Sequence, residues 1–84
     1  MSKLERILEA DSKSTYEDWL VDWIDDAIDE YDLTKRSTDR EVSNYVLNEI
    51  MPSKEVQKLM EDLGYKSFDR QADKIIKDIK KGLK

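Results

Sequence analysis

Apolar residues recur at steps of three and four along most of this chain, the spacing that gathers side chains on one face of an α-helix. The clearest run predicts a long amphipathic helix from about Thr15 to Asp32. Its apolar residues are Tyr16, Trp19, Leu20, Trp23, Ile24, Ala27, Ile28 and Tyr31. Because burial of each large apolar side chain contributes roughly 1.5–3 kcal/mol, we expect this stripe, with its two tryptophans, to be the centre of the core.

A shorter helix is predicted over Ser2–Ala10, followed by a turn at residues 11–14. Its features are an apolar stripe of Leu4, Ile7 and Leu8 and a possible capping box of Ser2 and Glu5. After the turn, the pairs with the spacing to cap the long helix are Ser14 with Glu17 and Thr15 with Asp18. We therefore expect two separate helices before residue 33.

Capping residues divide the second half of the chain into three further helices. Thr38 with Glu41 has the spacing of a capping box, and Ser53 and Ser67 are placed to cap the two helices that follow. The predicted apolar faces are Val42, Tyr45, Val46 and Ile50; Val56, Leu59, Met60 and Leu63; and Phe68, Ala72, Ile75, Ile76 and Ile79.

The predicted helices are joined by short connections. Leu33–Ser37 forms a break, and Pro52 ends a helix because the residue before a proline is pushed out of helical geometry. Gly64 follows a helix as a C′ residue able to take a positive φ, and Gly82 closes the last helix. A chain of 84 residues with two glycines and one proline fits one domain and disfavours a turn-rich β fold. We predict an all-α single domain over residues 1–84, a small bundle or orthogonal array of four to five helices.

The chain contains no cysteine and no histidine. We therefore expect no disulfide, no metal site built on thiolate or imidazole, and no nucleophile of the Ser-His-Asp or Cys-His type. These absences favour a non-enzymatic protein without a cofactor, in a reducing compartment such as the cytoplasm. No apolar run approaches the roughly 18 residues that a membrane-spanning helix needs, so we expect no membrane insertion.

The net charge of −5 is unevenly distributed. Residues 1–34 carry three bases and eleven acids, giving −8, whereas residues 35–84 carry twelve bases and nine acids, giving +3. Aspartate is a poor helix former, and like charges four residues apart destabilise a helix. Helix stability alone would not select the acids of the long helix, so this charge is the feature that most suggests a function. These acids, called the acidic face below, are Glu17, Asp18, Asp22, Asp25, Asp26, Asp29 and Glu30.

We interpret the acidic face as a docking surface for a basic surface on a larger protein. Carboxylates along a rigid helix imitate a row of phosphates and steer association, so the partner could be a nucleic-acid-binding protein. Small phage-encoded inhibitors of DNA-binding proteins work in this way, although a net charge of −5 allows only a partial DNA mimic. The protein would act as an inhibitor or adaptor. The alternative is a solvated face, paired or not with the basic tail of the same molecule.

A carboxylate metal site is a weaker interpretation of the same helix. Asp22, Asp25, Asp26 and Asp29 lie at i, i+3, i+4 and i+7, close enough to share a hard cation. The chain has no calcium-loop pattern, and the di-iron helical motif requires a histidine that this chain lacks. We therefore predict no metal site.

The region from Ser53 to Lys81 resembles a helix-turn-helix DNA-binding unit, with residues 57–65 as the positioning helix and glycine turn. The resemblance implies DNA contacts from Lys66, Ser67, Arg70, Gln71 and Lys74. Met60 replaces the usual small residue, and Gln71 stands where an apolar residue is expected unless Ala72 takes that position. The alternative is an ordinary helical hairpin with a solvated basic face.

Two further expectations concern assembly and the aromatic residues. Acidic and basic faces could pair between two copies of the chain, which would give a structural homodimer. The spacing of Trp19 and Trp23 predicts core positions, and exposure of either ring would instead make it an interface residue, because tryptophan is enriched in binding hot spots.

Overall fold

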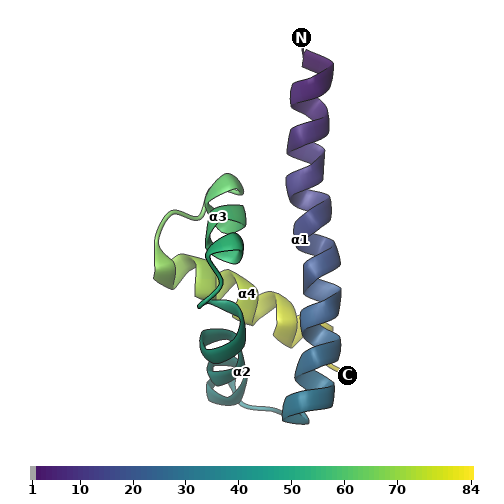
Figure 1. Cartoon of the computed structure of the whole chain (residues 1–84). Helices are drawn as coiled ribbons and strands as arrows, with labels where there is room; N and C mark the ends of the chain where they lie inside the picture. Colours follow the sequence, from purple (N-terminus) through teal and green to yellow (C-terminus); the bar gives the residue numbers. More distant parts are fainter. Residues whose placement is uncertain (1) are drawn as a thin grey trace.

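The computed structural model describes the backbone of residues 2–84 and the side chains of residues 13–84. This part of the chain forms four α-helices and one turn of π-helix, so the predicted all-α class is confirmed (Figure 1). The elements are α1 (Ser2–Tyr31), α2 (Asp39–Tyr45), η1 (Val46–Ile50), α3 (Lys54–Asp62) and α4 (Phe68–Gly82). None of the helices in the described part is long and apolar enough to cross a membrane.

Helix α1 is continuous through residues 11–14, so the predicted turn there is wrong. The stretch contains neither glycine nor proline, and the serines and aspartate in it only weaken a helix by a few tenths of a kcal/mol each. A helix that is already formed on both sides therefore propagates through it. The predicted caps at Ser14 and Thr15 fall inside α1 and are also wrong. The capping box of Ser2 with Glu5 and the stripe from Leu4 to Leu8 involve side chains outside the described residues.

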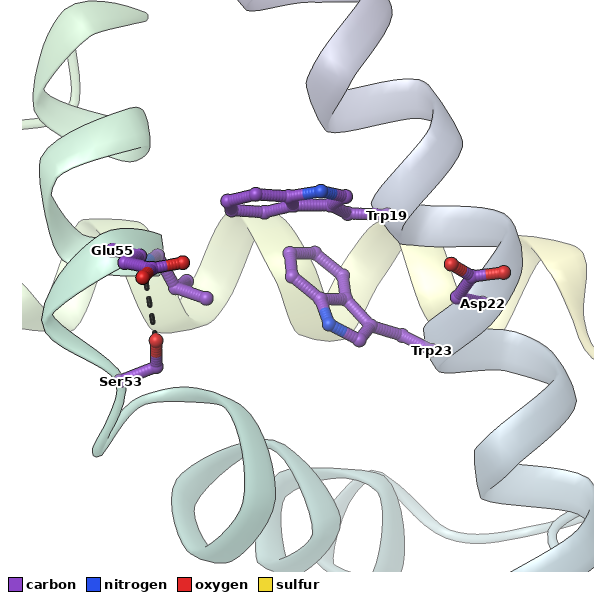
Figure 2. Close-up of a pocket in the computed structure, with 6 residues that line it drawn as sticks. Trp19, Asp22, Trp23, Ser53 and Glu55 are labelled. Atoms are coloured by element: carbon purple, nitrogen blue, oxygen red, sulfur yellow. Dashed lines mark hydrogen bonds between the residues drawn. The ribbon is translucent and has the colours of Figure 1, made fainter.

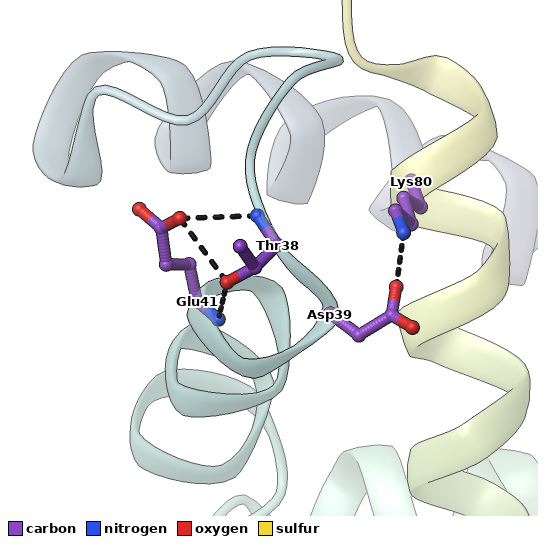
Figure 3. A network of polar contacts seen from close by, with 4 residues as sticks. All are labelled: Thr38, Asp39, Glu41 and Lys80. Carbon is purple, nitrogen blue, oxygen red and sulfur yellow. Dashed lines mark hydrogen bonds and ion pairs between the residues drawn. The ribbon is translucent and has the colours of Figure 1, made fainter.

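Helix α2 begins with the predicted capping box. The amide of Glu41 donates to the Thr38 hydroxyl at 3.2 Å, and the amide of Thr38 donates to the Glu41 carboxylate at 3.0 Å. Figure 3 shows this box beside the ion pair of Asp39 with Lys80, which links the start of α2 to the last turns of α4. The capping box fixes the start of α2, and the exposed ion pair lies at the contact between α2 and α4.

The end of the α2 segment departs from the predicted helix. Its last turn is the π-helix η1, in which the Met51 amide donates to the Val46 carbonyl at 2.9 Å. The wider turn keeps the predicted face of Val42, Tyr45, Val46 and Ile50 buried and brings Met51 into the core, where it is 1% exposed. Met51 was not predicted as a core residue, because the core positions of this segment were assigned with the spacing of an α-helix.

Helices α3 and α4 begin and end as predicted. The Ser53 hydroxyl accepts a hydrogen bond from the amide of Val56 at 3.4 Å, and the Ser67 hydroxyl accepts one from the amide of Arg70 at 3.2 Å. Gly64 connects the helices with φ +102°, a conformation that residues with a Cβ adopt rarely. In Figure 1, α4 runs across the molecule behind α2 and α3, and α1 stands along one side with its N-terminal end extending beyond the other helices.

The centre of the core lies between α2, η1, α3 and α4, not along α1. Its largest fully buried side chains are Tyr45, Ile50, Met51, Met60, Ile75, Ile79, Val42 and Val46. On α1 only Tyr16 and Ala27 of the predicted stripe are buried, four residues are half-buried, and Ile28 and Tyr31 are 36% and 37% exposed. The prediction that this stripe is the centre of the core is therefore wrong, because α1 packs against the other helices from one side only.

Two tyrosine hydroxyls attach α1 to the rest of the fold. Tyr16 donates to Asp78 of α4 at 2.5 Å, and Tyr45 of α2 donates to Asp26 of α1 at 2.9 Å. Burial raises the pKa of both hydroxyls above the usual range of tyrosine, and the hydrogen bond to a carboxylate raises each pKa further. Both phenols are therefore neutral donors that hold α1 in place.

Candidate interaction surface

All seven residues of the acidic face are exposed, as the docking hypothesis requires. Four of them follow one another at steps of four, three and four residues, which places them in a line parallel to the helix axis. These four, called the aspartate row below, are Asp18, Asp22, Asp25 and Asp29. A row of this kind presents a regular series of negative charges to an approaching molecule.

The aspartate row has no basic partner in the part of the chain whose side chains are described. The two ion pairs there are Lys74 with Asp78 and Lys80 with Asp39, and neither uses an acid of α1. Asp26 differs from the row because it accepts the hydrogen bond of Tyr45. The alternative in which the acidic face pairs with the basic tail of the same molecule is not observed among residues 13–84.

Exposed apolar side chains lie next to the aspartate row. Val21 is 59% exposed and Ile28 is 36% exposed. Both lie on α1 seven residues apart, which is two helical turns, so they share one flank of the helix. Ile28 was expected in the core and Val21 was not predicted at all, because a single apolar residue between aspartates gives no periodic signal. An exposed surface with both charge and apolar contacts is typical of an interface.

A cleft separates the middle of α1 from the start of α3. Its volume is about 220 Å³, and its lining residues, called the tryptophan cleft below, are Trp19, Asp22, Trp23, Ser53, Glu55 and Val56. Figure 2 shows both indole rings reaching from α1 toward α3, with Glu55 facing them and Asp22 on the α1 side. The rings meet edge to face with centroids 6.2 Å apart, and both residues are half-buried. The expectation that the tryptophans belong to the core is only partly confirmed.

A second cleft, of about 380 Å³, lies on another side of α1, between Tyr16 and the α3–α4 connection. Two of its charged groups are matched within the molecule, because Asp78 accepts the hydrogen bond of Tyr16 and forms an ion pair with Lys74 at 3.1 Å. Lys13 and Glu17 also line the cleft and form no ion pair in the part of the chain with described side chains. The cleft therefore lies at the contact between α1 and α4. Lys74 and Asp78 pair with each other there, so neither is an unpaired charge for a ligand.

The predicted DNA-contacting residues are only partly brought together. Lys66, Ser67 and Arg70 are exposed, and Arg70, Lys74 and Lys77 line a shallow cleft of about 320 Å³ with Tyr65 and Asp73, called the basic cleft below. Gln71 is 3% exposed, and its side-chain amide donates to the Tyr65 carbonyl at 2.8 Å. The prediction that Gln71 faces DNA is therefore wrong, because its amide satisfies the backbone at the α3–α4 connection. The Ser67 hydroxyl is occupied as a helix cap.

The aspartates proposed as metal ligands do not converge. In the part of the chain with described side chains, no group of three or more acidic side chains is arranged to hold a metal ion. The aspartate row points outward along α1, so its carboxylates are distributed along an axis and do not surround a point.

The residues of the tryptophan cleft on α3 could not be found from the sequence. Glu55 reads as an ordinary acid in the first turn of a helix, where it favours the helix dipole. Only the packing of α3 against α1 places it opposite two indoles. Comparison of the chain with protein-family models, curated proteins and solved structures gave no match, so its function is argued from these surfaces alone.

Proposed function

We propose that this protein is a non-enzymatic interaction module that docks the acidic face of α1 on a basic surface of a larger protein. In this role it acts as an inhibitor or adaptor, and a partner whose surface normally holds nucleic-acid phosphates fits the charge pattern. We place the protein in the cytoplasm, a proposal supported by the absence of cysteine.

The observation that carries the proposal is the exposed aspartate row, which has no basic partner among residues 13–84. Each pair of like charges four residues apart costs an isolated helix about 0.2–0.5 kcal/mol. A basic partner removes this repulsion and replaces it with attraction, which raises the association rate most strongly at low ionic strength. Val21 and Ile28 add apolar contact area beside the row.

Charge reversal with a matched control tests the proposal. The test variant changes Asp18, Asp25 and Asp29 to lysine and leaves Asp22 and Asp26 intact, because Asp22 lines the tryptophan cleft and Asp26 accepts the Tyr45 hydroxyl. The control variant changes the exposed acids Glu49, Glu61 and Asp62 to lysine, which alters the net charge equally.

Each immobilised protein is incubated at low salt with lysate of the source cells, and captured proteins are identified by mass spectrometry. We expect basic proteins that bind the wild type and the control but not the test variant. Equal capture by all three proteins would refute docking through the acidic face.

Nucleic-acid binding through α4 is the second candidate, supported by the convergence of three bases in the basic cleft. Phosphate contacts from these bases would weaken steeply with salt. A mobility-shift assay at low salt tests it: duplex binding that is lost when Arg70 and Lys74 are changed to alanine supports the candidate, and no shift at any concentration excludes it.

Self-association is the third candidate. The bases Arg70, Lys74, Lys77 and Lys81 of α4 follow one another at the same steps as the aspartate row. Sedimentation in low and high salt tests this pairing between copies, because a dimer held by charge dissociates as salt increases.

A further inference from the structure

We propose that the tryptophan cleft is a receptor for a single arginine side chain of the basic partner. This inference rests on the proposed function. It specifies the chemical group of the partner that binds and the cleft on this protein that receives it. The cleft combines two features that recognise an organic cation, namely aromatic faces and carboxylates, and none of its six lining residues is basic.

The aromatic part of the site consists of the two indoles. Tryptophan attracts a cation over its ring more strongly than the other aromatic side chains do. Trp19 and Trp23 are half-buried on a rigid helix, and each also packs on the core, so their positions are set before a ligand arrives. Val56, which is buried, adds an apolar surface for the methylene stem of a long basic side chain.

The carboxylates come from two different helices. Asp22 lies on the α1 side and Glu55 faces the indoles from α3 (Figure 2). Neither forms an ion pair in the described part of the chain, so both are available to a cation. Asp22 also belongs to the aspartate row, so the row that steers a basic partner leads directly into the cleft.

The size and chemistry of the cleft favour one guanidinium group. Sites for drug-sized ligands have volumes of roughly 300–1,000 Å³, and this cleft has about 220 Å³. The guanidinium group is planar and weakly hydrated. It stacks on aromatic rings and can donate two parallel hydrogen bonds to one carboxylate, whereas a lysine ammonium is strongly hydrated. Arginine and tryptophan are also the residue types that dominate binding hot spots.

Fluorescence of the full chain measures binding to the cleft directly, because Trp19 and Trp23 are its only tryptophans. The probe is an acetylated and amidated heptapeptide with one central arginine and two flanking lysines. The comparison peptide replaces arginine with citrulline, which keeps the shape and removes the charge. We expect saturable quenching or shift of the emission by the arginine peptide, and an affinity about tenfold lower for the citrulline peptide.

Conservative variants locate the site. Glu55→Gln and Asp22→Asn should each weaken the arginine peptide by about three- to tenfold, whereas Glu61→Gln, on the same helix as Glu55 but outside the cleft, should bind like the wild type. Trp19→Phe keeps an apolar ring for packing and should also weaken binding. Thermal unfolding of each variant checks that the fold is retained, and the glutamine and asparagine variants leave the core untouched.

The outcomes separate this inference from the proposed function. Equal affinity for both peptides, or equal binding by Glu55→Gln and Glu61→Gln, overturns the arginine site. If in that case both peptides bind the wild type and bind the charge-reversal variant of Asp18, Asp25 and Asp29 more weakly, docking on the acidic face stands without the cleft. If the cleft variants bind the arginine peptide more weakly and the charge-reversal variant binds it like the wild type, the arginine site stands. The steering role of the aspartate row is then refuted. No binding of either peptide at low salt overturns the arginine site, while docking on the acidic face is decided by the capture experiment.

Discussion

Gln57 and Gln71 occupy the same position in two successive helices, four residues after the capping serine. The side-chain amide of Gln57 donates to the Met51 carbonyl at 2.7 Å, and that of Gln71 donates to the Tyr65 carbonyl at 2.8 Å. In both cases the acceptor lies two residues before the serine. Each glutamine therefore fixes the direction in which the chain enters its helix, which explains why a polar residue occupies a buried position on α4.

Replacement of Gln71 by alanine tests this role. The change leaves the Tyr65 carbonyl without its donor in a partly buried site, so we expect a loss of about 1–2 kcal/mol in the free energy of unfolding. Gln57→Ala should cost less, because Gln57 is only half-buried. Urea denaturation of both variants gives the comparison, and an equal or smaller loss for Gln71→Ala would contradict the account.

Because of the two tyrosine hydroxyls that attach α1, the stability of the folded protein should fall at alkaline pH. The ordinary pKa of tyrosine is 10.0, and the folded state raises that of Tyr16 and Tyr45. Above pH 10 the unfolded chain loses these protons while the folded chain keeps them, so stability is full below pH 10 and falls as the pH rises further.

We expect a loss of at most about 1.4 kcal/mol per pH unit for each of the two tyrosines, because both hydroxyls are only partly buried. Tyr16→Phe and Tyr45→Phe should each flatten the decline between pH 10 and pH 11.5, measured by urea denaturation at fixed pH. Tyr31→Phe is the control, because it removes a hydroxyl and keeps the ring that packs edge to face on Tyr45. A decline that is the same in all variants would show that other groups cause it.

At the scale of elements, α1 and α4 approach each other closely at Gly82. A Cβ at this position would collide with the Cδ1 atom of Ile24 on α1. The glycine therefore permits a close approach of the two helices, a reason for its presence beyond the predicted end of a helix. The half-buried Ile24 is held in turn by the last turn of α4.

Gly82→Ala should destabilise the protein by no more than about 1 kcal/mol, because the overlap falls on the rotatable end of the Ile24 side chain and alanine is otherwise the better helix former. Ile24→Ala removes the colliding atoms, so the double variant should lose less stability than the two single losses added together. Thermal unfolding of the four proteins measures the coupling. Additive losses would show that the two residues are not in contact.

At the scale of the whole molecule, the charge is separated between helices. The acidic face lies on α1, the basic cleft lies on α4, and the ion pairs among residues 13–84 do not connect the acidic face to the basic tail. The acidic face therefore has no basic partner within the described part of the molecule, while the basic cleft is partly neutralised by the ion pair of Lys74 with Asp78. This arrangement favours association with other molecules over the stability of the single chain.

Removal of charge from the aspartate row should therefore stabilise the isolated protein. Changing Asp25 and Asp29 to lysine replaces the repulsion from Asp22 and Asp26, each three residues earlier, with attraction and places positive charge near the negative end of the helix dipole. We expect a gain of about 0.5–1 kcal/mol at low salt that shrinks at high salt. Urea denaturation at both salt concentrations measures it, and a loss of stability would indicate that these aspartates have favourable partners within the fold.

The sequence by itself determined the local features of this protein. The capping residues Thr38, Ser53 and Ser67, the positive φ of Gly64 and the apolar faces of α2 and α3 depend on neighbours within a few residues, and a periodic pattern records them. The exposure of the acidic face was predictable for the same reason, because charged side chains remain in water.

Only the tertiary structure decided which faces meet. It moved the centre of the core to α2, η1, α3 and α4 and turned Gln71 inward. It also brought Glu55 opposite Trp19 and Trp23. These outcomes depend on contacts between residues far apart in the chain, whose geometry follows from the simultaneous packing of all four helices and leaves no periodic signal in the sequence.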